Sequence, residues 1–137
     1  MAGITDIRDG LATRLRTIGA PLNVYDEWPD QVVPPAVLVR PASAQYEQTF
    51  GADWTSMQLE CLVVVTTKGG LKNAELALEP YISNTGASSL RAAIAGDRSL
   101  GGNVKYTFIR GWRNYDVVDV NGMELLSAVV EVDCELS

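Results

Sequence analysis

Among the residues of this chain, a row of acidic side chains has the type and spacing best suited to metal binding or acid–base catalysis. Glu131, Asp133 and Glu135 alternate along one stretch, so in a strand they would share one face at steps of about 7 Å. A carboxylate row of this kind could hold a metal or supply a general acid and base. Calcium loops have a different spacing with a central glycine, and three like charges on a strand are typical of a solvated face. The row therefore predicts a solvated surface, with no catalytic site and no metal site.

Two glycine-rich segments also resemble ligand-binding turns. Residues 68–72 read Lys-Gly-Gly-Leu-Lys between an expected strand and an expected helix, and a helix N-terminus attracts phosphate. Their spacing matches neither the P-loop nor the dinucleotide-binding fingerprint, so we expect only a turn with positive φ angles. Residues 96–102 hold Asp97 and three glycines, and we expect them to end a helix and turn the chain.

Composition excludes several classes of enzyme and binding protein. The chain has 137 residues, 17 acidic and 11 basic, a net charge of −6 and no histidine. Without histidine there is no Ser-His-Asp or Cys-His relay, and Cys61 and Cys134 cannot build a metal cage alone. The acidic balance opposes nucleic-acid binding, including a stacking platform at residues 110–113, because such binding needs clustered lysine and arginine. We therefore expect no cofactor.

The chain has the size and patterning of one soluble domain spanning 1–137. Its first residues carry Asp6, Arg8 and Asp9, so no signal-peptide core is expected, and its longest apolar run, 62–65, is too short to cross a membrane. A protein made in a reducing cytosol keeps its thiols free. We expect Cys61 and Cys134 to be buried small hydrophobic residues and not a disulfide.

Apolar periodicity predicts an α+β fold with a mostly antiparallel or mixed sheet. Helices are expected at 4–18, 71–82 and 88–95, and strands at 22–25, 36–40, 54–67, 104–112, 117–120 and 123–136. The N-terminal helix and the two central helices should pack on one face of the sheet. Strand 54–67 is apolar on both faces, which indicates a central position. The Asn121-Gly122 pair predicts the turn of the C-terminal hairpin.

Aromatic residues are the best candidates for an interface. On the expected strand 104–112, we expect Val104, Tyr106, Phe108 and Trp112 to share one face. The segment 41–57 is long and polar, with aromatic side chains at its tips. We expect it to form a protruding β-hairpin or arm that becomes ordered by packing against a neighbouring molecule. The candidate residues for a subunit or tube interface are Trp28, Tyr46, Phe50, Trp54 and Trp112.

The order of these elements resembles the tail terminator proteins of long-tailed phages, the minor tail protein U-like family. The resemblance covers nearly the whole chain. It lies in the amphipathic opening helix, Val24-Tyr25-Asp26, the Pro-Pro-Ala-Val-Leu-Val run at 34–39, the aromatic arm around Tyr46 and Phe50, and Asp53-Trp54 before the long strand. Two helices, the Leu-Gly-Gly-Asn-Val run at 100–104, the Arg-Asn-Tyr run at 113–115 and the final hairpin complete it.

The resemblance implies a structural virion protein and not an enzyme. It implies a homo-oligomeric ring, commonly a hexamer, on the head-proximal end of the phage tail tube, assembled in the host cytoplasm and retained in the virion. Such a ring stops polymerisation of the tail tube protein and joins a head-completion or neck protein. DNA passes through it without specific binding, and no membrane is involved.

The charge suggests how DNA could pass through such a ring. Six copies at −6 each carry about −36, and a negative channel repels the phosphate backbone. This hypothesis requires acidic residues, with Glu131, Asp133 and Glu135 as candidates, to face the lumen. The alternatives are a neck or head-closure connector, a small ligand-binding α+β domain or enzyme, and a regulatory dimer. A deep pocket with converging polar groups and perturbed pKa values would favour an enzyme, whereas exposed apolar patches would favour assembly.

Overall fold

A computed structural model describes residues 3–46, 54–120 and 122–135 and confirms an α+β fold. In chain order the elements are α1 (Ile4–Arg16), β1 (Asn23–Tyr25), β2 (Ala36–Tyr46), β3 (Trp54–Thr66), α2 (Leu71–Ile82), α3 (Leu90–Ala95), β4 (Tyr106–Val120) and β5 (Met123–Glu135). The strands form one sheet in the order β1-β2-β3-β5-β4, in which β1 and β2 are parallel and the other neighbours are antiparallel. The first and last strands in this order, β1 and β4, are therefore its edges.

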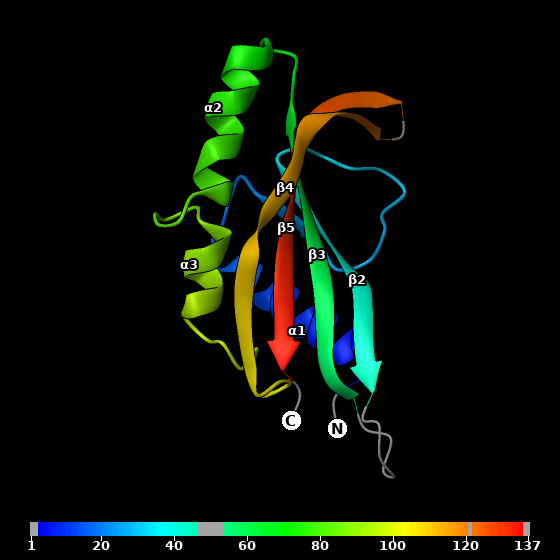
Figure 1. Cartoon of the computed structure of the whole chain (residues 1–137). Helices are drawn as coiled ribbons and strands as arrows, with labels where there is room; N and C mark the ends of the chain where they lie inside the picture. The colour runs from blue at the N-terminus through cyan, green and yellow to red at the C-terminus, as the bar shows by residue number, and fades with distance from the viewer. Residues whose placement is uncertain (1–2, 47–53, 121, 136–137) are drawn as a thin grey trace.

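All three helices cover one face of the sheet (Figure 1). α1 supplies Ile7, Leu11 and Leu15 to the main core, and α2 and α3 add further buried apolar side chains. The sheet supplies alternate residues of β3 and β5, as the period-two pattern predicts. From β3 and β5 these are Met57, Leu59, Cys61, Val63, Val65, Leu126, Ala128, Val130, Val132 and Cys134. We call this side the helix face and the other side the outer face.

The outer face has a second, smaller apolar cluster at one end. Leu62 and Val64 of β3 contribute to it, so the central strand is buried on both faces, as its sequence predicts. The loop at residues 26–35 supplies the buried Val32, and the β4–β5 hairpin supplies Val120 and Leu125. In Figure 1 the turn end of this hairpin (orange) bends over toward that loop. The other half of the outer face carries charged side chains together with the exposed Tyr106 and Phe108.

The predicted face of the edge strand is wrong at Trp112. Tyr106 and Phe108 pair with Glu135 and Asp133 on the outer face, whereas Trp112 pairs with Val130 on the helix face. The register shifts between Ile109 and Gly111, which is a β-bulge. One extra residue in a strand reverses which face the following side chains occupy. Tyr106 and Phe108 are 44% and 37% exposed on the outer face.

The predicted arm is mostly part of the sheet. β2 extends to Tyr46, six residues beyond the predicted strand, and this extension pairs with β3 as far as Tyr46 opposite Trp54. Ser56 pairs in turn with Glu135, and Met57 is buried. The predicted β-hairpin is therefore present, but Ser56 and Met57 lie within the sheet and not on an arm beyond it. The tip, 47–53, lies outside the described residues.

Gly10 has a packing role that its helix propensity does not predict. In mid-helix, glycine costs about 1 kcal/mol relative to alanine. A Cβ built at Gly10 would lie 2.7 Å from the Leu100 carbonyl oxygen and 2.8 Å from Asn103 Nδ2. Leu100 is fully buried and has a φ of +51°, and Asp97 accepts hydrogen bonds from Ser99 and Gly101 in the same turn. Glycine therefore lets the turn between α3 and β4 lie directly on α1.

Both cysteines are buried and free, which confirms the prediction that they are small buried residues and not a disulfide. Burial raises the pKa of Cys61 from 9.0 to about 12. It also raises the pKa of Cys134 to about 11, although a hydrogen bond from the Thr107 hydroxyl to the Cys134 sulfur opposes the shift. Both thiols are thus held neutral inside the main core.

These thiols should be inert in the folded protein. At pH 8 we expect iodoacetamide to alkylate them on the order of 100-fold more slowly than in unfolded chain, because the thiolate is the reactive form. Stability should also fall as pH rises from about 9 toward about 12, since only the unfolded chain then loses thiol protons. Mass spectrometry and denaturation at several pH values check this. Equal alkylation rates in the two states would contradict it.

Candidate functional site

Six charged side chains form an ion-pair ladder across four strands of the outer face. The ladder runs Arg40, Glu60, Arg113, Glu131, Arg110, Asp133. Arg40 Nη2 and Arg113 Nη2 lie 2.9 Å and 2.7 Å from the two oxygens of Glu60. Arg113 Nε lies 3.0 Å from Glu131, and Arg110 Nη2 lies 2.9 Å from Asp133. Hydrogen bonding to Asp133 raises the pKa of Arg110.

The ladder changes the interpretation of the predicted acidic row. Glu131 and Asp133 do share a face, as predicted, but each is paired with arginine, so the ladder carries three positive and three negative charges. Glu135 lies exposed at the end of β5. A lumen position for the three residues stays a prediction. If this face lines a channel, it presents balanced charge along the ladder, and repulsion of DNA must come from other carboxylates.

The ion-pair ladder was not predicted from the sequence, although the strand register set by the hairpin turn indicates it. Counting outward from Asn121-Gly122, an unbroken hairpin sets Arg110 opposite Asp133. The bulges move the register by a residue or more, yet long arginine side chains still reach the carboxylates on β5. The register of a strong turn signal therefore predicts cross-strand charge pairs.

Glu60 should be the most sensitive position of the ladder, because both its oxygens are occupied and its side chain is only 18% exposed. We expect Glu60→Gln to lower the free energy of unfolding by about 1 kcal/mol, the upper end for exposed pairs. The loss should shrink in high salt, which screens the ladder. Urea denaturation at low and high salt measures both effects, with the exposed Glu75→Gln as control. A loss no larger than that of the control would contradict the prediction.

The candidate interface aromatics do not gather into one patch. Trp28 is 57% exposed in the loop at residues 26–35, where it lines a groove of about 480 Å³ with Leu62 and Val129 on the outer face. Trp112 is 50% exposed on the helix face. Tyr46 and Trp54 pair at the described ends of β2 and β3, and Phe50 lies outside the described residues. The described structure therefore gives two separate tryptophan sites, one on each face.

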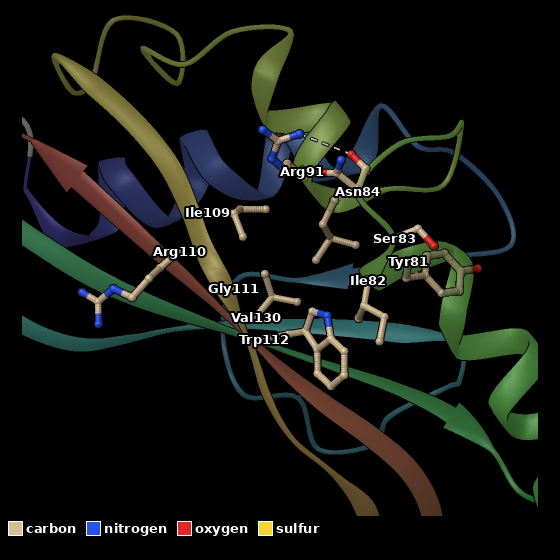
Figure 2. Close-up of a pocket in the computed structure, with 11 residues that line it drawn as sticks. Tyr81, Ile82, Ser83, Asn84, Arg91, Ile109, Arg110, Gly111, Trp112 and Val130 are labelled. Atoms are coloured by element: carbon tan, nitrogen blue, oxygen red, sulfur yellow. Dashed lines mark hydrogen bonds between the residues drawn. The ribbon is translucent and has the colours of Figure 1, made fainter.

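Trp112 forms one wall of a cleft between edge strand β4 and the α2–α3 connection. The edge cleft, as we call it, has a volume of about 280 Å³. Its apolar lining consists of Ile82, Leu90, Ile109, Trp112 and Val130. Figure 2 shows Arg91 at the end of the cleft away from Trp112, with its Nη1 3.5 Å from the Asn84 carbonyl oxygen. The centroid of the Tyr115 ring lies 5.8 Å from that of the Trp112 ring.

A second cavity, of about 350 Å³, lies between α1 and the α3–β4 turn and is lined by polar side chains. Arg14 donates from Nε and Nη2 to the Ala93 carbonyl at 3.0 Å and 2.8 Å, and Asn103 donates to the Leu100 carbonyl. Hydrogen bonds from the Ser99 hydroxyl and the turn amides lower the pKa of Asp97. These groups end α3 and turn the chain, as predicted for residues 96–102. Each of them has a hydrogen-bond partner within the protein, so a ligand is not needed to explain why polar groups gather here.

Asp9, which lines this second cavity, forms a carboxyl pair with Asp26. A hydrogen bond with Asp26 raises the pKa of Asp9 and lowers that of Asp26.

Among the described residues, no group of three or more acidic or cysteine side chains is placed to hold a metal ion. Within the same residues, no helix is long and apolar enough to cross a membrane. A comparison with protein-family profiles and with curated proteins found no match for this chain.

Proposed function

We propose that this chain is a structural virion protein that forms a ring on the head-proximal end of a phage tail tube. The ring ends tube polymerisation and presents the surface that joins the head. Its partners are copies of itself, the tail tube protein and a head-completion or neck protein, while DNA passes through without specific binding. The proposal rests on the resemblance in element order, to which the surface of the fold adds independent support.

The observation that carries the proposal is the pair of exposed tryptophans on opposite faces of the sheet. A monomer gains little by leaving Trp28 and Trp112 half exposed in separate hollows, and tryptophan is among the residues enriched at the centres of protein interfaces. A ring needs two different patches on each subunit, because each copy contacts the next head to tail. Two distinct patches on the two faces meet that requirement.

Edge strand β4 adds a third apolar surface. This surface consists of Tyr106 and Phe108, which are 44% and 37% exposed on the outer face, on the opposite side of the sheet from Trp112. The rings of Tyr106 and Phe108 lie 6.2 Å apart, and Arg98 lies over Tyr106. Aromatic side chains with a neighbouring arginine are enriched at interface centres. This surface is available for the tube protein or for the neck protein.

Tube polymerisation in vitro tests the proposal. Adding the chain to polymerising tail tube protein should shorten the tubes in proportion to the amount added, because each ring blocks one growing end. A neck or head-closure connector would instead join finished ends without changing tube length. A tube length that is independent of added protein would therefore overturn the terminator function.

A further inference from the structure

We propose that Trp28 of one copy, with the acidic residues beside it, inserts into the edge cleft of the next copy. The contact rests on the proposed function in one respect, that this chain assembles with itself. It names the occupant of the edge cleft, a second copy of the chain, and the segment of that copy that enters. It also pairs the two separate tryptophan sites, so that Trp28 of one copy meets Trp112 of the next.

The inserting segment is held in place from behind and carries an anchor between negative charges. Residues 26–30 read Asp-Glu-Trp-Pro-Asp, and both Glu27 and Trp28 are exposed. The loop is fixed behind this segment, because Val32 is buried in the outer-face cluster and Asn23 Nδ2 donates to the Val33 carbonyl at 2.8 Å. A loop that is already ordered loses little entropy on binding. The segment therefore presents a ready-made aromatic anchor.

The edge cleft matches this segment in size and in charge. A cavity of about 150 Å³ holds a benzene ring, so the cleft, at about 280 Å³, accommodates an indole between Ile82, Ile109 and Trp112. Arg91 lies exposed at one end of the cleft (Figure 2), and no carboxylate among the described residues lies within ion-pair distance of it. An acidic residue beside the inserted ring supplies that missing charge. Glu27 is the exposed candidate.

The occupant must come from another molecule. Trp28 lies over the outer face, in a groove with Val129, whereas the cleft opens on the helix face, where Val130 lines it. The sheet separates the two sites within one chain. With a net charge of −6, copies of the chain repel each other at long range, so association requires a local match of opposite charges, which Glu27 and Arg91 provide. The contact joins unlike patches and can therefore close a ring.

A charge-exchange experiment tests the contact. Light scattering and sedimentation would measure the assembly of Trp28→Ala, Glu27→Arg, Arg91→Glu and the Glu27→Arg/Arg91→Glu double variant. We expect each single change to weaken association at least about tenfold and the double variant to recover most of the loss, because the opposite charges meet again. Leu76→Ala is the matched control, since Leu76 is also 57% exposed but lies on α2, outside the cleft lining. Thermal unfolding verifies that each variant is folded.

Either of two results with the variants would overturn the contact: a Trp28→Ala protein that assembles like the wild type, or a double variant that assembles no better than its single variants. A wild-type chain that stays monomeric at high concentration would overturn it too. None of these results refutes the proposed function. That function fails only if the chain neither binds tube ends nor changes tube growth. The contact and the function therefore fail separately.

Discussion

Replacing Gly10 with alanine is expected to lower the free energy of unfolding by about 2 kcal/mol, within the range for overpacking a close contact. The loss is expected although alanine is the better helix former by about 1 kcal/mol. The new methyl group would lie 2.7 Å from the Leu100 carbonyl oxygen, which belongs to backbone and cannot rotate away. Relief requires α1 to move away from a turn whose Leu100 is anchored in the core.

Urea denaturation of Gly10→Ala measures this effect. Gly111→Ala is the control, because its added methyl group meets no heavy atom within 4 Å and its φ is not positive. We expect the control to change stability by less than about 0.5 kcal/mol, as most surface substitutions do. If Gly10→Ala were as stable as the wild type or more stable, helix propensity would outweigh packing here and the close approach of α1 to the turn would be wrong.

Removing the Arg14 side chain is expected to lower the free energy of unfolding by about 2 kcal/mol, because hydrogen bonds from a charged donor are stronger than those between neutral groups. Arg14 projects from α1 and donates twice to the carbonyl of Ala93, in the last turn of α3. A short helix of six residues has little stability of its own. Arg14→Ala should therefore loosen α3 and the wall of the edge cleft that Leu90 forms.

Arg16→Ala is the matched control on the same helix. Arg16 is exposed and makes one longer contact, from Nη2 to the Val24 carbonyl at 3.4 Å. We expect it to cost less than about 0.5 kcal/mol. Denaturation curves give the two losses, and hydrogen exchange of the α3 amides locates them. Equal losses in the two variants would show that α3 does not depend on Arg14.

Local pattern predicts most of the fold. The spacing of Ile7, Leu11 and Leu15 sets the buried stripe of α1, and Asn121-Gly122 marks the final turn because few other pairs accept its geometry. The sequence does not show where a strand bulges. The bulge near Gly111 turned Trp112 to the opposite face from Tyr106, and it depends on contacts across the whole sheet.

The candidate site was only partly predictable for the same reason. Trp28 and Trp112 were identified from aromatic residues in polar or edge segments, and both are at least half exposed. The edge cleft was missed, because its walls come from α2, α3, β4 and β5 and meet only in three dimensions. The pairing of Glu131 with Arg113 was missed because charge was counted along one strand and not across two.

Negative-stain imaging of purified tail tubes, with and without the chain, tests the central claim most directly. We expect a ring of density on one end of each tube, and no further growth from that end when tube protein is added. Tubes whose ends stay bare and continue to grow in the presence of excess chain would contradict it.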